Sequence, residues 1–206
     1  MKVLLINGSP HEKGCTYTAL SLIAGELNAQ GIETEILHVG GQPVGGCIGC
    51  GGCRSGNGCV FGGVVNEAIE KAKTADAFVF GSPVHYASAA GNMASFMDRL
   101  AYAGGKYLAY KPAAICCSAR RAGTTSTLDQ LVKYPQFFHM PLVNGSYWAM
   151  VHGSNPEQVL QDAEGCAVMQ ELGRNMAWLL RCIEAGKAAG IDHPQNPPRP
   201  MTSFIR

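Results

Sequence analysis

The sequence predicts one α/β domain over residues 1–206: a doubly wound, five-stranded parallel sheet of order 2-1-3-4-5 with helices on both faces. Three observations predict it. Short apolar runs alternate five times with segments of helical periodicity, a pattern typical of right-handed crossovers. At 206 residues the chain is long enough to bury one full core, and no stretch resembles a linker. The loops after the first, third and fourth strands are distinctive, and this strand order brings them to one edge.

The expected strands are short apolar or β-branched runs. The first, residues 2–7, is a continuous apolar run, as expected of a parallel strand buried on both faces. All five strands are predicted over residues 2–7, 32–39, 77–81, 112–117 and 140–150.

The expected helices carry apolar residues three and four positions apart, as Leu20, Ile23 and Leu27 show. They are predicted over residues 15–30, 64–74, 91–102, 125–134 and 155–186, with the last one interrupted at Gly165 or Gly173. Two segments fall outside this pattern. Residues 41–62 form a loop rich in glycine and cysteine, and residues 192–206 form a proline-rich, irregular tail.

The first loop has the features of an anion-binding site. Gly8 allows a sharp turn after the first strand, and a helix starts near Cys15. The N-terminus of a helix offers free backbone N–H groups and the positive end of its dipole, which favour a phosphate. Ser9, Thr16 and Thr18 add hydroxyl donors.

Two common phosphate-binding patterns do not match this loop. A P-loop has four residues between its glycines and ends in Gly-Lys-Ser/Thr, whereas five residues separate Gly8 from Gly14 and Cys-Thr follows. The dinucleotide pattern G-x-G-x-x-G is absent as well. A loop lined by hydroxyls and amides, with Lys13 as its one lysine, suits a phosphate monoester such as that of flavin mononucleotide (FMN). The alternative is an ordinary connection between a strand and a helix.

Nearly the whole chain resembles the flavodoxin-like NADPH-dependent FMN reductases, and within them the iron-sulfur flavoproteins. The resemblance rests on GSPHEKGCT (8–16), CIGCGGCRSGNGC (47–59), GSPVHYAS (81–88), SARRAGTTSTLDQL (118–131) and YWAMVHG (147–153). It implies a flavodoxin-like fold and a bound FMN that carries the chemistry, without a catalytic side chain. It also implies a homodimer or homotetramer.

The resemblance assigns the three loops to different parts of FMN. The phosphate is implied to lie on Ser9, Cys15, Thr16 and Thr18, with Cys15 where the family usually has asparagine. The isoalloxazine ring is implied to lie along Pro83, Val84, His85 and Tyr86. Its pyrimidine end is implied to face Ser118, Arg120, Arg121, Gly123 and Thr124. Taken singly, His85 also fits a structural hydrogen-bonding role, and each arginine fits a solvated surface charge.

Three residues in and just after the predicted fifth strand fit structural roles better. Tyr147 and Trp148 end the predicted fifth strand, where aromatic side chains usually bury area. We expect them to pack in the core or between subunits rather than against the flavin. We expect a structural role for His152 too.

Besides Cys15 of the first loop, the other eight of the nine cysteines divide into two groups. Four of them, Cys116, Cys117, Cys166 and Cys182, fall in a buried strand or the last helix and are predicted to be small core residues. The second group lies in one glycine-rich loop with the spacing C-x₂-C-x₂-C-x₅-C and consists of Cys47, Cys50, Cys53 and Cys59. This spacing suits a [4Fe-4S] cluster. A tetrahedral zinc site and free thiols are the alternatives.

Composition excludes several functions. The formal net charge is +1 and 15% of residues are charged, so nucleic-acid binding is not expected. The apolar runs are too short to span a bilayer, and no signal-like leader opens the chain, so no membrane association and a cytoplasmic location are expected.

The function predicted from these features is FMN-dependent oxidation and reduction. The protein takes hydride from NAD(P)H and passes electrons to a small acceptor such as a quinone, an azo or nitro compound, or free flavin. In the alternative, a [4Fe-4S] cluster and FMN shuttle electrons to and from a partner such as ferredoxin. A zinc-binding or sensing module without flavin is a third hypothesis.

Overall fold

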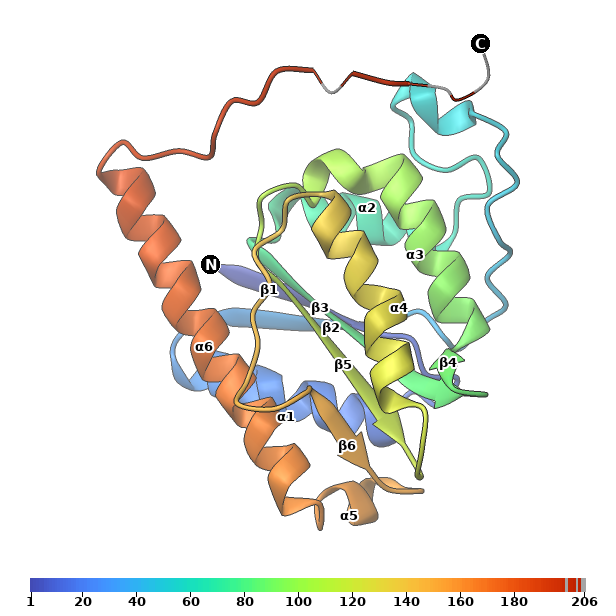
Figure 1. Ribbon diagram of the computed structural model, residues 1–206, viewed down its shortest axis with the longest axis vertical. Helices are drawn as coiled ribbons and strands as arrows, with labels where there is room; N and C mark the ends of the chain where they lie inside the picture. Colours follow the sequence, from blue (N-terminus) through green and yellow to red (C-terminus); the bar gives the residue numbers. More distant parts are fainter. Residues whose placement is uncertain (199, 203, 205–206) are drawn as a thin grey trace.

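The computed structural model describes residues 1–198, 200–202 and 204, and its centre is a parallel sheet (Figure 1). The strand order β2-β1-β3-β5-β6 confirms the predicted order 2-1-3-4-5. These strands are β1 (Lys2–Asn7), β2 (Glu33–His38), β3 (Ala77–His85), β5 (Ala113–Ala119) and β6 (Met150–His152). A sixth, two-residue strand that the sequence did not predict, β4 (Ser88–Ala89), pairs antiparallel with the end of β3.

Helices cover both faces of the sheet, as predicted (Figure 1). The helices α1 (Cys15–Ala29) and α6 (Ala163–Ala188) pack on one face, and α2 (Val64–Thr74), α3 (Gly91–Gly104) and α4 (Thr124–Phe137) pack on the other. Alternation along β1 explains this arrangement. Val3 and Leu5 belong to the core under α1 and α6, while Leu4 and Ile6 belong to the opposite core. Every apolar side chain of the strand is therefore buried.

The last strand is much shorter than predicted. Only residues 150–152 form β6, and the predicted start of the strand retains one isolated bridge, between Ala113 and Leu142. Pairing resumes at Cys117 and Met150, so β5 advances four residues while its neighbour advances eight. The four extra residues form a loop beside the sheet. The turn-forming pair Asn144-Gly145 explains the interruption, since such residues favour a bend over extended pairing.

The last helix is interrupted at a different place from the one predicted. A short helix, α5 (Pro156–Val159), is separated from α6 by residues 160–162, and neither Gly165 nor Gly173 interrupts α6. Asp162 starts the new helix because its Oδ1 accepts a hydrogen bond from Gly165 N at 3.0 Å. Gly173 marks a close helix crossing instead: an added Cβ would lie 2.8 Å from the backbone oxygen of Ile23 in α1.

The remaining segments connect or extend this framework. The cysteine-rich loop contains one short 3-10 helix, η1 (Gly52–Ser55), and a second one, η2 (Gly105–Tyr107), follows α3. In the tail, the described residues from 192 onward form no helix or strand, while residues 199, 203, 205 and 206 of that predicted segment lie outside the described part. Among the described helices, none combines the length and the apolar character needed to cross a membrane.

Candidate functional site

The three distinctive loops meet at the carboxyl edge of the sheet. The first connects β1 to α1, the second is the turn between β3 and β4, and the third connects β5 to α4. Neighbouring strands hold them together. Gly8 N, at the start of the first loop, donates a hydrogen bond to Gly81 O of β3 at 2.9 Å, and β3 pairs with β5 as far as Pro83 and Ser118. The strand order reverses at this edge, where ligands of doubly wound sheets bind.

The N-terminus of α1 presents free hydrogen-bond donors at this edge. Gly14 is the N-cap residue and has no side chain to cap the helix, and the first turn contains no acidic residue. Within the described part of the chain, the backbone N–H groups of Cys15, Thr16 and Tyr17 donate no hydrogen bond to another residue. Three parallel donors at the positive end of a helix fit a phosphate group.

A buried asparagine, which sequence reasoning missed, shapes the first loop. The fully buried Asn7 accepts a hydrogen bond from Ser9 N at 3.1 Å and donates one to Glu12 O at 2.9 Å. Ser9 is buried too, and its Oγ accepts a hydrogen bond from His11 N at 3.1 Å. The signal in the sequence was an amide residue that ends an apolar strand, since asparagine often bonds to backbone a few residues ahead.

The two threonine hydroxyls that were predicted to face the phosphate already have partners. Thr16 Oγ1 lies 2.9 Å from Ser118 Oγ, and both residues are buried. Thr18 Oγ1 donates to Gly14 O at 3.2 Å, inside the first helical turn. In this arrangement the backbone N–H groups are the available phosphate donors, and a direct role for either threonine hydroxyl stays a prediction.

The second loop is a two-residue hairpin turn with an unusual backbone. Tyr86 and Ala87 lie between the paired residues His85 and Ser88, and both have positive φ values, 49° and 58°. Such a turn normally contains glycine or asparagine, so the backbone here is strained. Of the four residues predicted to face the flavin ring, Pro83 and Val84 are half-buried in β3, whereas the side chains of His85 and Tyr86 are exposed.

The third loop holds the second in place. Ser126 Oγ, in the first turn of α4, donates to Ala87 O at 2.7 Å. Gly123 has a φ of 94°, and an added Cβ would lie 2.6 Å from Ala87 Cα, so only glycine fits this contact. Thr124 is buried at the start of α4, whereas Arg120 and Arg121 are exposed and form no ion pair with any described residue.

A fourth loop, after β6, also reaches this edge. Cys15 Sγ donates a weak hydrogen bond to Gly153 O at 3.5 Å, and burial raises the pKa of the Cys15 thiol. The thiol of this residue is therefore a neutral group beside the free N–H groups. The neighbouring His152 donates its backbone N–H to Asp162 Oδ2 at 2.7 Å, which anchors the loop to the start of α6.

The four cysteines of the glycine-rich loop surround a separate pocket. It has a volume of about 270 Å³ and is also lined by Arg99 of α3. The thiols do not converge: within the described residues, no three His, Cys, Asp or Glu side chains are placed to hold a metal ion. The donor set itself, four thiols beside a buried arginine, fits a thiolate-ligated cluster, which would require the loop to draw its thiols together.

The other cysteines partly match their predicted roles. Cys116 and Cys117 are buried in β5, as predicted. Cys166 is half-buried, and its Sγ donates to Val159 O at 3.2 Å. Cys182 is exposed on α6, so its prediction as a core residue is wrong. The period of the helix places it on the solvent side, two positions beyond the buried Leu180.

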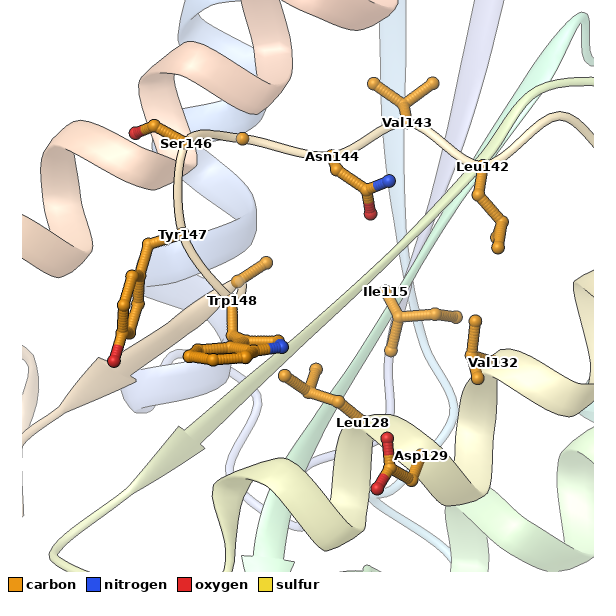
Figure 2. Close-up of a pocket in the computed structure, with 12 residues that line it drawn as sticks. Ile115, Leu128, Asp129, Val132, Leu142, Val143, Asn144, Ser146, Tyr147 and Trp148 are labelled. Carbon is orange, nitrogen blue, oxygen red and sulfur yellow. The ribbon is translucent and has the colours of Figure 1, made fainter.

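Tyr147 and Trp148 lie in the loop before β6 and line a pocket of about 480 Å³ (Figure 2). Their side chains are 50% and 59% exposed, so the predicted core packing is wrong. They contact each other edge to face, with ring centroids 4.7 Å apart. The pocket opens between this loop, β5 and α4, and none of the residues predicted to bind FMN lines it. The packing of Tyr147 and Trp148 between subunits remains a prediction.

Comparison with known proteins agrees with this geometry. The family model of the NADPH-dependent FMN reductases matches residues 1–155. An iron-sulfur flavoprotein of Methanocaldococcus jannaschii is 27% identical over 192 residues, which cover 89% of this chain and 100% of that protein.

Solved structures show the same fold. RosB, with a bound 8-demethyl-8-formylriboflavin-5′-phosphate intermediate, matches with a TM-score of 0.71 and 15% identity over 100% of this chain and 94% of that one. An archaeal flavodoxin matches with a TM-score of 0.60 and 14% identity over 88% of this chain and 99% of that one. The fold is therefore flavodoxin-like, as predicted.

Proposed function

The chain belongs to the NADPH-dependent FMN reductase family and is an oxidoreductase of the FMN reductase type; from this premise we propose that it takes hydride from NAD(P)H and passes electrons to a small acceptor. The observation that carries the proposal is the set of three N–H groups at the start of α1 that donate to no other described residue, at the edge where the distinctive loops meet. The acceptor class is a quinone, an azo or nitro compound, or free flavin.

The protein residues hold and orient the cofactor. FMN, when bound, supplies the centre that accepts and releases the hydride. The backbone of Cys15, Thr16 and Tyr17 binds the phosphate through three N–H groups, and the helix dipole favours its charge. Asn7 and the Thr16–Ser118 pair fix the loop before any ligand arrives, so little ordering accompanies binding.

The second and third loops provide the face for the flavin ring. Pro83 and Val84 stiffen the strand that leads into the hairpin, and Gly123 and Ser126 hold the turn. The exposed guanidinium groups of Arg120 and Arg121 supply positive charge, which suits the negative charge that the pyrimidine end of a flavin gathers on reduction. The exposure of His85 and Tyr86 leaves the edge open to flat acceptors of different kinds.

An anaerobic spectroscopic titration tests this function. The purified protein is loaded with FMN, separated from free flavin, and mixed with NADPH or NADH. We expect the flavin absorbance to bleach with one of the two donors and to return on addition of a quinone. If the protein retains FMN but neither donor bleaches the flavin, the proposed reductase function is contradicted. Failure to retain FMN would contradict the assigned site.

A second candidate function is electron transfer between a [4Fe-4S] cluster, FMN and a partner protein such as ferredoxin. The observation that favours it is the single pocket lined by Cys47, Cys50, Cys53 and Cys59. The similar protein from M. jannaschii is named as an iron-sulfur flavoprotein. In this case the cysteine loop would hold the cluster, and iron and acid-labile sulfide would accompany FMN in protein purified anaerobically. Protein prepared in that way without either would count against this candidate and leave the first intact.

Three further expectations belong to this proposal. The nine free cysteines support a reducing, cytoplasmic location. The exposed aromatic side chains of Tyr147 and Trp148 support an assembly, a homodimer or homotetramer, that covers them. The small net charge supports small-molecule or protein partners rather than nucleic acid. Sedimentation of the FMN-loaded protein checks the second of these expectations.

A further inference from the structure

Arg99 is a buried cation without an anionic partner. Its residue is 6% exposed and lies in α3, on the side that faces the cysteine loop. Its side chain forms no ion pair with any residue that the structure describes. A charge taken out of water is costly unless a counter-charge offsets it, so the surroundings of Arg99 call for an explanation.

The guanidinium group joins the two ends of the cysteine loop. Its Nη1 donates to Gly45 O at 3.3 Å and its Nη2 to Gly62 O at 3.1 Å. One side chain therefore binds residues near both ends of the loop. Its Nε donates to the sulfur of Cys59 at 3.2 Å. The ring of Phe61 lies beside the group, 5.3 Å from ring centroid to guanidinium carbon. These contacts satisfy N–H donors but supply no full negative charge.

Cys59 is the fixed member of the four cysteines. Asn66 of α2 holds its backbone from both sides, since Cys59 N donates to Asn66 Oδ1 at 2.8 Å and Asn66 Nδ2 donates to Cys59 O at 3.0 Å. Arg99 holds its sulfur. By contrast, Cys47 and Cys50 are exposed on the glycine-rich part of the loop. The loop can therefore close by moving the other thiols toward a sulfur that is already in position.

The pocket thus combines four potential thiolates with one buried, uncompensated positive charge. An iron-sulfur cluster ligated by four thiolates carries a net negative charge in both of its redox states, and nearby charge is one determinant of its potential. Residues around a metal site also orient its ligands. Such a centre would supply the negative counter-charge that Arg99 lacks.

We propose that Arg99 is the counter-cation and positioning residue of a thiolate-ligated iron-sulfur centre in the cysteine loop. It holds Cys59 in place and offsets the negative charge of the loaded loop. This inference rests on the second candidate function, and it assigns a role that the cysteine spacing alone does not.

Anaerobic reconstitution of the full-length protein with ferrous iron and sulfide tests the proposal. The variants are Arg99→Gln, which removes the charge, Arg99→Lys, which retains it, and Arg54→Gln as the matched control. Arg54 lines the same pocket but is exposed, so water screens its charge. The readouts are iron and sulfide per chain, the midpoint potential of the cluster from an electron paramagnetic resonance titration, and bound FMN.

We expect Arg99→Gln to retain iron roughly 10- to 100-fold more weakly than the unaltered protein. Any cluster that forms should have a lower midpoint potential, because loss of positive charge disfavours the more negative reduced state. Arg99→Lys should recover most of the potential, and Arg54→Gln should change both quantities little. FMN content reports whether each variant is folded.

Two results would overturn the proposal. One is an equal effect of Arg99→Gln and Arg54→Gln on iron retention and potential. The other is an unaltered protein that binds FMN normally but takes up no iron or sulfide, which would leave the reductase function standing. Where Arg99→Gln does not fold, Arg99→Met removes the charge while keeping an apolar stem of similar length, a replacement that buried charges often tolerate.

Discussion

The hydroxyl groups of Thr16 and Ser118 meet at 2.9 Å, although 102 positions separate them in the sequence. The contact joins the first turn of α1 to the end of β5, so it ties two of the loops at the carboxyl edge. Both residues are buried, which makes the pair sensitive to the loss of either partner.

Removing either hydroxyl of this pair is expected to destabilise the protein, and removing both should cost less than the sum of the two separate losses. Thr16→Val leaves the Ser118 hydroxyl buried without its partner, and we expect a loss of about 1–3 kcal/mol in the free energy of unfolding. Ser118→Ala should act in the same way, and the double variant should lose less than the sum of the two. Urea unfolding of all four proteins measures this. Additive losses would show that the two hydroxyls do not depend on each other.

A capping residue at Gly14 should strengthen the helix and weaken FMN binding. The carboxylate of Gly14→Asp can accept the N–H groups of the first turn, and we expect the flavin-free protein to gain a few tenths of a kcal/mol. The same carboxylate competes with the FMN phosphate, so the dissociation constant should rise about tenfold or more. Gly14→Ala is the control, because its Cβ meets His11 at the same 3.0 Å but caps nothing. Fluorescence titration with FMN checks the result. Equal FMN affinities of the two variants would contradict the placement of the phosphate at the N-terminus of α1.

Stability should fall in alkaline solution because of the two cysteines buried in β5. Burial raises the pKa of Cys117 from its ordinary value of 9.0 to about 12, and it raises the pKa of Cys116 as well. Above pH 9 the unfolded thiols lose protons that the folded thiols keep, so the unfolded state is favoured as the pH rises toward 12. The limiting slope is about 1.4 kcal/mol per pH unit for each thiol.

Urea unfolding between pH 8 and pH 10.5, values chosen to span the ordinary thiol pKa of 9.0, measures this dependence. The double variant Cys116→Ala with Cys117→Ala should show a clearly flatter fall of stability than the unaltered protein. The two slopes are compared rather than the stabilities, since the substitutions also leave small cavities. Parallel curves would assign the alkaline loss to other groups.

Two glycines in helices should respond to alanine in opposite directions. A Cβ at Gly173 of α6 would lie 2.8 Å from Ile23 O and from Glu26 Cβ, so Gly173→Ala should lose about 1–3 kcal/mol. A Cβ at Gly25 of α1 meets no described atom within 4 Å, so Gly25→Ala should gain about 0.5–1 kcal/mol from helix propensity. Thermal unfolding of the two variants compares them directly. A gain at Gly173 would mean that the helices separate easily there.

The framework could be predicted from sequence because local patterns decide it. The apolar run of β1 and the spacing of Leu20, Ile23 and Leu27 each require one kind of burial, and the structure buries them in that way. The fifth strand was predicted too long because the apolar residues around Leu142 and Met150 were joined across the turn-forming pair Asn144-Gly145. That pair signals a bend, but only tertiary pairing shows that the chain leaves the sheet between Leu142 and Met150.

The candidate site was predictable to a similar extent. The three loops do meet at one edge, which follows from strand order alone. The partners of Thr16 and Ser118, and the contact of Arg99 with Cys59, depend on residues tens of positions apart. No periodicity or spacing encodes such pairs. A charged residue among the apolar positions of α3 was the one sign that Arg99 had a particular role.

The register jump beside β5 has a consequence for hydrogen exchange. The amides of Ala113 and Cys117 donate to Pro141 O and Ala149 O, but the amide of Ile115 between them has no acceptor in the part of the chain that is described. Although Ile115 is 8% exposed and central in its strand, it lines the pocket of Figure 2. Its deuterium uptake should therefore be much faster than that of either neighbour, a local weak point in the sheet.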